Sequence, residues 1–351
     1  MAGNKIRAKF DFNFGKIQFP LEDRMAHAFD RNGLSGRGKS FSRRNFLAVA
    51  SAAACSAVSL PRDVQPAVAA RGPYQGKLCL FSKPLPEMDW RRLARAAKRV
   101  GFDGIDLTVR PGGHVLPESA AEDLPKAVSI IREEGLDVPM ITTALVSASD
   151  PAARAILSTA GKLSIPFYKP GYYMYKLVDV RKELERAGNE FRGLVELGKQ
   201  FGMQAGYHNH EEYVGAPVWD MATVIETLDP KWTGYYFDVR HATAEGGVGC
   251  WKIATNLVLP RLKMAAVKDF YWEKTAKGWR DQNCPLGEGM VDWKYYFGAL
   301  AQAGFQGPIS LHLEYEIPGA TAAEKVDNTL AALKRDLYFL KARIQEVYEK
   351  Q

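Results

Sequence analysis

The sequence predicts a parallel (β/α)8 barrel in a single domain, preceded by an export leader. Three observations support the barrel: strand-like and helix-like segments alternate from residue 72 onward, the run contains eight strand candidates, and no Gly-rich phosphate turn follows the first of them. A doubly wound open sheet, the alternative, would usually carry such a turn. We expect the barrel to occupy residues 72–351 without a linker.

The predicted strands are short apolar or alternating runs between turn residues. They cover residues 77–83, 104–109, 138–145, 163–169, 204–210, 234–241, 262–270 and 309–316. Segments of helical period lie between them at 88–101, 121–135, 181–202 and 293–304, and each ends in a glycine suited to a left-handed cap. Residues 321–350 predict one long amphipathic helix, or two, that closes the barrel.

Residues 1–69 have the pattern of a twin-arginine export leader. Arg43 and Arg44 precede a weakly apolar, Ala-rich run over 46–60, and a small-residue cleavage site follows at 67–69. We therefore expect an exported, periplasmic protein, and the sequence leaves open whether the chain starts at Met1 or Met25. No apolar run reaches the roughly 18 residues that a membrane span needs.

The positive charge of the chain belongs largely to this leader. It carries 11 Lys and Arg against 5 Asp and Glu, which leaves 36 against 35 in the remainder, a formal charge of +1. A near-neutral barrel gives no reason to expect nucleic acid or an anionic membrane as partner. The sequence does not decide whether the chain forms a homo-oligomer. Of the four cysteines, the three that lie beyond the leader (Cys79, Cys250 and Cys284) are widely spaced and form no CxxC pair, so they predict no disulfide framework.

In each predicted strand of the second half, the polar residues occupy alternate, even-numbered positions near the C-terminal end of the strand. Since alternate residues of a barrel strand face inward, these side chains are expected to converge at the mouth where barrel enzymes carry their chemistry. The inward set comprises His208, His210, Tyr236, Asp238, Arg240, Lys268, Ser310, His312, Glu314 and Glu316.

Five histidines lie at or just after predicted strand ends. They are His114, His208, His210, His241 and His312. A lone buried histidine usually serves packing, whereas five at one rim indicate a functional site. Imidazole and carboxylate ligands together suit Zn²⁺, Mn²⁺, Fe²⁺ or Co²⁺ better than Ca²⁺ or Mg²⁺. We therefore expect one divalent metal, whose identity stays open.

Several motifs together resemble a known family. YHNH, FDVRHA, VKDF, PLGEGMVDW and GPISLHLEY, in this order along the strands, are similar to the xylose-isomerase-like TIM-barrel superfamily, the sugar phosphate isomerases and epimerases. The resemblance covers nearly all of residues 76–338. It implies one divalent metal held by Glu, Asp, His and Glu from strands five to eight. It also implies two carboxylates that move a proton between neighbouring carbons of a keto-sugar.

By position, the resemblance implies Asp238 and Glu314 as the metal ligands from strands six and eight. Two positions depart from the family pattern. His208 stands in place of the strand-five Glu, and Ala266 stands in place of the strand-seven His. We expect His208, Asp238 and Glu314 to hold the metal, with His312 as the fourth ligand.

Three residues are expected to take part in catalysis. Glu314 is the carboxylate that remains of the implied proton pair, and His210 is expected to be a substrate contact or base. Lys268 has two readings: it binds a substrate oxygen or acts as a base, or it forms only a structural ion pair with Glu314 or Asp238. Asn209, on the opposite parity, is expected to face the helices.

Four further residues are expected to contact the substrate. Arg110 and His114 lie in the loop after the second strand, although a Pro-Gly turn with incidental polar residues is the alternative there. His241 follows the sixth strand. Glu288 lies between glycines that let the backbone approach a ligand.

These features predict a metal-dependent isomerase or epimerase, or a related dehydratase, acting on a non-phosphorylated keto-sugar or polyol. Phosphate binding usually needs a Gly-rich turn at a helix N-terminus or an Arg and Lys cluster, and the loops after strands seven and eight show neither clearly. A non-catalytic, exported carbohydrate-binding barrel is the alternative, because one carboxylate of the implied pair is missing. A phosphodiesterase similar to the superfamily's DNA-repair endonucleases is disfavoured by the near-neutral charge.

Overall fold

The computed structural model describes residues 72–348, in which eight short barrel strands each overlap one of the predicted runs. They are β1 (Leu78–Phe81), β2 (Gly104–Val109), β3 (Asp137–Thr143), β4 (Phe167–Lys169), β5 (Gln204–His208), β6 (Thr233–Asp238), β7 (Leu262–Val267) and β10 (Ile309–Leu311). The predicted runs 234–241, 262–270 and 309–316 extended too far at their C-terminal ends. The predicted leader, residues 1–69, lies outside the described residues.

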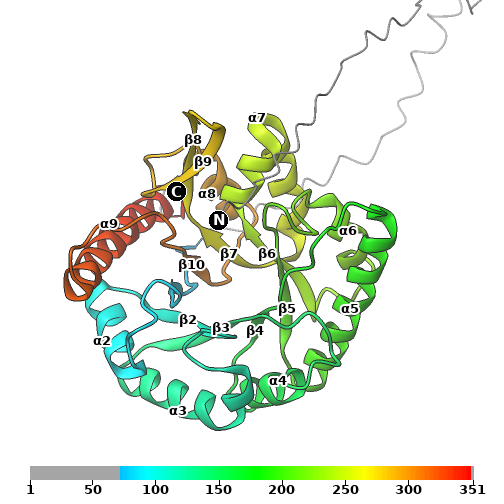
Figure 1. Cartoon of the computed structure of the whole chain (residues 1–351), viewed down its shortest axis with the longest axis horizontal. Coiled ribbons are helices and arrows are strands. Elements are labelled where there is room, and N and C mark those ends of the chain that lie inside the picture. The colour runs from blue at the N-terminus through cyan, green and yellow to red at the C-terminus, as the bar shows by residue number, and fades with distance from the viewer. Residues whose placement is uncertain (1–71, 349–351) are drawn as a thin grey trace, which may run out of the picture. The chain divides into compact units, whose positions relative to one another are not determined.

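The strands are parallel and close into a barrel in the order β1-β10-β7-β6-β5-β4-β3-β2 (Figure 1). Because β1 pairs with both β2 and β10, the sheet has no free edge, which excludes the open-sheet alternative. The predicted (β/α)8 fold is confirmed.

Helices surround the barrel (Figure 1). They are α2 (Trp90–Val100), α3 (Ala120–Glu133), α4 (Ala153–Lys162), α5 (Val180–Gln200), α6 (Trp219–Ile225), α7 (Val239–Val258), α8 (Trp293–Gln302) and α9 (Ala322–Tyr348), with short 3₁₀ turns at Pro117–Ser119 and Leu259–Arg261. Local chemistry sets their ends: the Asp89 side chain accepts a hydrogen bond from the N–H of Arg92 at 2.8 Å, and Gly101 ends α2 at φ 107°. The C-terminal segment is one helix. None of the described helices is long and apolar enough to cross a membrane.

The barrel has two clusters of buried apolar side chains. The larger core lies between the strands and the helices, where side chains such as Leu107 and Phe237 are buried. A smaller cluster of Met140, Tyr236, Met264 and Ala266 joins β3 to β6 and β7. Since β3 is not a neighbour of β6, this cluster fills the barrel interior. Gly206 leaves room for it, because a Cβ there would lie 2.1 Å from the Met264 methyl carbon.

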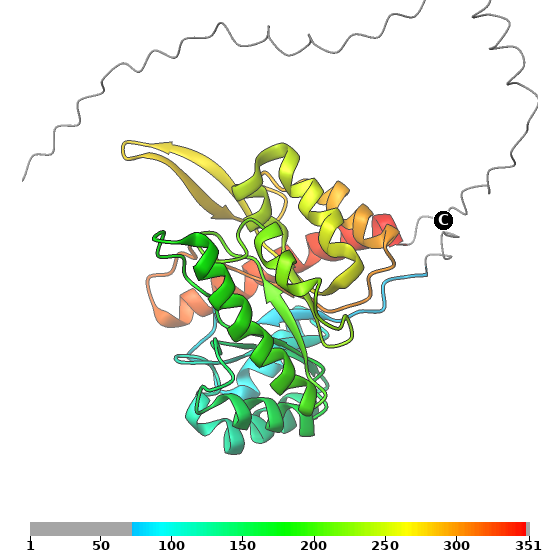
Figure 2. The same ribbon diagram turned by 90° about the vertical axis from the view of Figure 1, so that its right-hand side faces the viewer.

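An antiparallel hairpin projects from the barrel directly after β7 (Figure 2). Its strands are β8 (Asp269–Thr275) and β9 (Gly278–Cys284), paired from Asp269↔Cys284 to Thr275↔Gly278. Most of this segment was predicted to be a loop. The hairpin matters for the barrel mouth because one of its residues, Asp281, reaches the polar cluster described below.

Candidate active site

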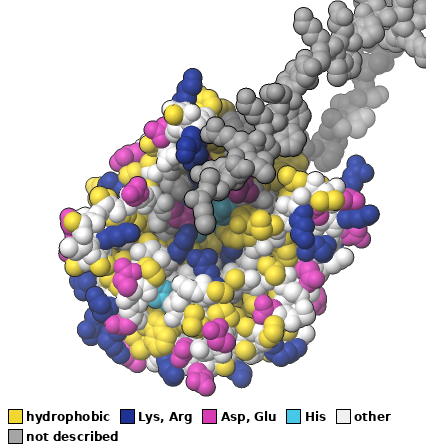
Figure 3. Space-filling view, in the orientation of Figure 1, with side chains coloured by type: hydrophobic (Ala, Val, Ile, Leu, Met, Phe, Trp, Pro, Cys, Tyr) yellow, Lys and Arg dark blue, Asp and Glu magenta, His cyan; other side chains and the backbone are white. Residues whose placement is uncertain are grey.

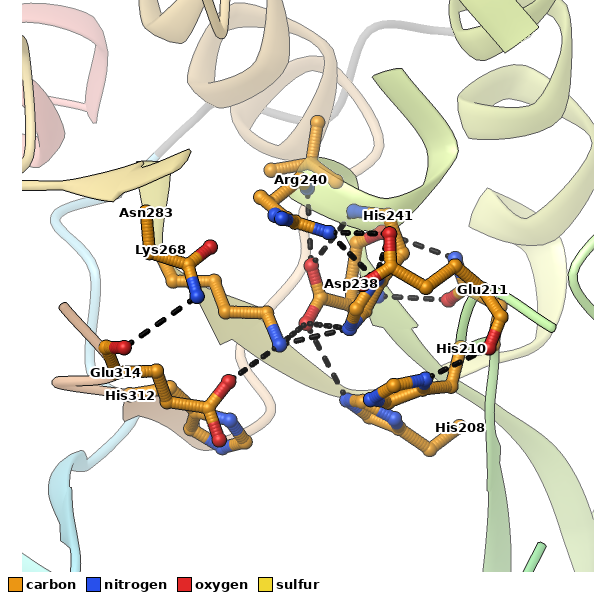
Figure 4. A network of polar contacts seen from close by, with 12 residues as sticks. His208, His210, Glu211, Asp238, Arg240, His241, Lys268, Asn283, His312 and Glu314 are labelled. Carbon is orange, nitrogen blue, oxygen red and sulfur yellow. Dashed lines mark hydrogen bonds and ion pairs between the residues drawn. The ribbon is translucent and has the colours of Figure 1, made fainter. Parts of the chain in front are cut away.

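The polar ends of four neighbouring strands meet at the mouth of the barrel (Figure 4). His208 ends β5 and Asp238 ends β6, while Lys268 follows β7 and both His312 and Glu314 follow β10. The cluster is well shielded from water: the Glu314 side chain is the most open of the five, at 18% exposed. The structure thus brings together the side chains that strand parity placed on the inner face.

Asp238 is held from several sides. Its Oδ1 accepts hydrogen bonds from the backbone N–H groups of Arg240 (2.9 Å) and His241 (3.1 Å) and so caps α7, which is why the strand ends here. The Asn209 amide bonds both the N–H and the C=O of Asp238, at 2.8 and 3.0 Å. Burial raises the pKa of Asp238, but Lys268 and His241 outweigh burial and hold that pKa well below its usual range. Asp238 therefore stays ionised.

Lys268 bridges the two carboxylates of the cluster. Its Nζ lies 2.7 Å from Glu314 Oε2, 3.3 Å from Asp238 Oδ2 and 2.7 Å from His241 Nε2. Burial lowers the pKa of Lys268, but the carboxylates outweigh burial and raise that pKa, so the ammonium stays charged. Glu314 accepts a second bond from Lys83 at 2.8 Å. Burial raises the Glu314 pKa, and these lysines bring it well below its usual range.

His208 and Asp238 each present one ligand atom that lacks a hydrogen-bond partner among the described residues. His208 Nδ1 lies 3.0 Å from the Tyr172 hydroxyl, and its Nε2 faces Asp238 Oδ2 at 3.5 Å. Two ligands of one tetrahedral ion, each about 2.0–2.2 Å from it, lie about 3.3–3.6 Å apart. Burial lowers the pKa of His208 well below its usual range, which keeps the imidazole in the neutral form that a metal needs.

His312 is the third group that fits a metal. The ligand atoms of His208, Asp238 and His312 all lie within 4.8 Å of one another. His312 Nε2 also lies 2.9 Å from the Tyr236 hydroxyl. The residues present therefore fit a divalent ion with these three ligands. Glu314, expected as one of the three main ligands, lies instead between Lys83 and Lys268, whose charges balance that of its carboxylate.

The rings of His210 and His241 are in contact at the edge of the cluster, with centroids 3.9 Å apart and planes tilted by 40°. His210 Nδ1 lies 2.9 Å from the backbone C=O of Glu211, so Nδ1–H donates there and Nε2 remains an acceptor. Burial lowers the pKa of His210, which makes it a neutral base near pH 7. His241 was expected to contact the substrate, but its two nitrogens face Lys268 and Arg240, and it does not line the cavity.

Arg240 links the projecting hairpin to the mouth. Its buried guanidinium forms ion pairs with Glu211, at 2.6 Å, and with Asp281 of β9. These carboxylates and the effect of Asp238 raise the Arg240 pKa against the opposing effect of burial. Arg240 was predicted to lie on the inner face, but its two carboxylate partners were not predicted.

Of the other three predicted substrate contacts, one lies at the cavity and two do not. Arg110 lines the cavity of the cluster. His114 has both ring nitrogens engaged, with a threonine hydroxyl at 3.3 Å and a backbone carbonyl at 3.1 Å, and it is absent from the lining. The Glu288 side chain is 60% exposed and lies 3.8 Å from Arg335, away from the cluster. The structure thus brings only Arg110 of these three to the site.

A cavity of about 70 Å³ opens in the middle of the cluster. Its lining is Phe81, Lys83, Arg110, Thr142, Lys169, Tyr172, His208, His210, Tyr236, Lys268, His312 and Glu314. Ligand sites typically measure about 300–1,000 Å³, so this cavity holds only the reacting part of a ligand. A wider hollow of about 650 Å³ between α7 and α8 lies outside the barrel and has no histidine in its lining.

Lys169 is one of several cavity residues, with Lys83 and Thr142, that were not predicted from the sequence. It ends β4, the same place in its strand that His208 and Asp238 hold in theirs. This position at a strand's C-terminal end was the available signal, but a strand of three residues shows no polar alternation.

The fold and the mouth together define a class: a (β/α)8-barrel enzyme scaffold with a buried, charged site at the C-terminal ends of its strands. The chain belongs to the family described as xylose isomerase-like TIM barrel, whose profile matches residues 94–341.

Relatives of known name are sugar epimerases or share the barrel. L-ribulose-5-phosphate 3-epimerase UlaE of Shigella flexneri is 24% identical over 266 residues, covering 71% of this chain and 91% of that protein. A xylose isomerase-like TIM barrel protein from Mycobacterium smegmatis, solved in complex with magnesium, has a TM-score of 0.61 at 14% identity, covering 79% and 99%. D-psicose 3-epimerase from Clostridium cellulolyticum H10, solved with D-tagatose, has a TM-score of 0.58 at 11% identity, covering 76% and 99%. At these identities, structural likeness shows the fold.

Proposed function

We propose that the protein is a metal-dependent epimerase or isomerase that moves a proton next to the carbonyl of a non-phosphorylated keto-sugar or polyol. One observation carries the proposal. His208 Nε2 and Asp238 Oδ2, neither of which has a hydrogen-bond partner among the described residues, face each other at 3.5 Å beside the charged Lys268–Glu314 pair at the barrel mouth. The names of the relatives, which include sugar epimerases, support a sugar as the substrate.

Three residues would hold the metal, and other residues would move the proton. A divalent ion held by His208, Asp238 and His312 would polarise the substrate carbonyl and acidify the neighbouring C–H bond. His210 is the stronger base of the cavity, because its imidazole is neutral and its Nε2 is a free acceptor. Glu314 is ionised and presents its carboxylate to the same cavity.

Lys268 is expected to position Glu314 and to donate a hydrogen bond to a substrate oxygen. Its ammonium already holds the Glu314 carboxylate at 2.7 Å, and its pKa is raised, so it acts as a donor and not as a base at neutral pH. An epimerase must remove a proton from one face of a carbon and return one on the other face. His210 and Glu314 supply the two groups that this requires.

Hydrogen exchange tests the proposal directly. Purified protein with Mn²⁺ or Co²⁺ is incubated in D₂O with D-fructose, D-psicose or D-tagatose, and NMR follows deuterium entry beside the carbonyl and the appearance of an epimer. Replacing His210 by Gln or Glu314 by Gln is expected to slow exchange about 100-fold or more. Glu288→Gln, an exposed carboxylate away from the cluster, is the matched control and should leave exchange unchanged.

Three outcomes discriminate among the functions. Exchange that stops after chelation and returns with the metal supports the proposal. Sugar binding without exchange would favour the carbohydrate-binding barrel, and loss of water without an epimer would favour a dehydratase.

We infer that the protein works in the periplasm after twin-arginine export. The support is the Arg43–Arg44 pair, the weakly apolar run over 46–60 and the small-residue site at 67–69.

A further inference from the structure

The cavity carries positive charge that the proposed proton transfer does not use. Its lining holds four cationic side chains and one carboxylate, Glu314. Lys83 and Lys268 both bond to this Glu314. The other two, Arg110 and Lys169, form no ion pair with a carboxylate anywhere in residues 72–348. Figure 3 shows Lys and Arg side chains, in dark blue, gathered near the middle of the barrel face.

Lys169 is a buried amine without a counter-ion. The residue is 2% exposed, and its Nζ lies 3.3 Å from the ring centroid of Tyr172. The carboxylate whose charge affects it most, Asp106, is already satisfied by three hydroxyl groups: those of Thr142 at 2.8 Å, Ser310 at 2.8 Å and Tyr236 at 3.1 Å. Burial without an ion-pair partner lowers the pKa of Lys169 well below its usual range. A ligand anion would supply the missing partner.

Arg110 provides the second donor. It directly follows β2, and β3 alone separates β2 from β4, where Lys169 lies. Arg110 and Lys169 both line the same cavity of about 70 Å³, so the two groups are close. Two like charges facing one cavity attract an anion between them. A guanidinium adds specificity, because its parallel N–H groups match the oxygens of a carboxylate or phosphate.

We propose that Arg110 and Lys169 form a subsite for an anionic oxygen group of the substrate, and that the substrate is a keto-sugar acid. This inference rests on the proposed function for the keto-sugar part of the ligand. A carboxylate is favoured over a phosphate because the cavity measures only about 70 Å³. The loops after strands seven and eight lack a clear cation cluster, whereas this pair lies after β2 and at the end of β4.

Three sugars of one configuration separate the chemistries. D-Fructose, D-fructuronate and D-fructose 6-phosphate differ only at C6, which carries a hydroxyl, a carboxylate or a phosphate. Isothermal titration at low salt is expected to show D-fructuronate binding at least about tenfold more tightly than D-fructose, as removal of a charged hydrogen bond typically costs. Arg110→Gln and Lys169→Met should each abolish this preference. Lys126→Met, which removes an equal charge from a side chain 60% exposed on α3, should preserve it.

Each outcome bears on the subsite. Equal binding of D-fructose and D-fructuronate, failure of all three sugars to bind, or a preference that survives both variants would overturn the inference. Tightest binding of the phosphate ester would support the subsite but refute a non-phosphorylated substrate. A preference for the acid without deuterium exchange would support the subsite while the proposed epimerase fails. Thermal unfolding checks each variant, and if Lys169→Met does not fold, the half-buried Arg110 variant decides.

Discussion

Replacing Asp238 by Asn separates the two tasks of this carboxylate. Its Oδ1 caps α7 through the N–H groups of Arg240 and His241, and its Oδ2 faces His208 and Lys268. An Asn side chain retains an oxygen for the cap but loses the charge. Asp238→Ala loses both.

The structure gives the expected magnitudes. Loss of an N-cap costs about 1 kcal/mol. Loss of one partner from a buried ion pair costs about 3–5 kcal/mol, but Lys268 keeps Glu314 at 2.7 Å, closer than Asp238 at 3.3 Å. We therefore expect the Asn variant to lose about 2 kcal/mol of unfolding free energy and the Ala variant about 3 kcal/mol.

Metal content and urea unfolding measure the two tasks independently. After dialysis against Zn²⁺, Mn²⁺ or Co²⁺, the wild type should retain one equivalent by mass spectrometry. Both Asp238 variants should lose far more metal affinity than the 10–100-fold that is typical when an outer contact is removed. Asn209→Ala, which loosens the backbone of Asp238 without removing a ligand, should fall within that 10–100-fold range. Full metal retention by Asp238→Asn would refute the assigned ligands.

Three further predictions follow from the same contacts. Lys268→Met should strengthen metal binding, because it removes the ammonium 3.3 Å from Asp238, while it slows deuterium exchange; weaker metal binding would contradict this competition. The free energy of unfolding should fall as pH drops below 6.5, because burial lowers the pKa of His208 and His241 and the unfolded chain then binds more protons. Urea titrations at pH 7.5 and 5.5 should show this fall, and replacing both residues by Gln should flatten it. Lysine in place of both arginines at 43–44 should trap the precursor in the cytoplasm, and cell fractionation that still finds exported protein would exclude the twin-arginine route.

The barrel could be predicted because the buried faces of its strands and helices require apolar residues at regular spacings in the sequence. The hairpin β8–β9 could not, since most of its residues are exposed, and an exposed two-stranded ribbon has no buried face to impose a pattern. The strand ends were also misplaced for a physical reason. The alternation of polar and apolar residues continues beyond the end of β6. The strand nevertheless ends at Asp238, because the Asp238 side chain caps α7, which begins at the next residue.

The residues of the candidate site that belong to the strands themselves could be predicted from the sequence. His208 and Asp238 end their strands, so parity suffices for them. Glu314 was placed in the right region, and its ion pair with Lys268 was one of the two interpretations given, but its second partner Lys83 was not predicted, because Lys83 follows β1 at the other end of the chain. His114 was misjudged because the loop after β2 folds back and uses both of its ring nitrogens. Loop paths of this kind leave no periodic signal in the sequence.

Charge balance links the metal, the lysines and the proposed anion subsite. Two negative charges, on Asp238 and Glu314, already face two positive charges, on Lys268 and Lys83. A divalent ion at His208, Asp238 and His312 would add net positive charge to a buried site, which is unfavourable without compensation. An acidic substrate supplies that compensation, because its carboxylate brings negative charge into the same cavity. The metal and the substrate anion are therefore expected to favour each other's binding, and by thermodynamic linkage the benefit is equal in both directions.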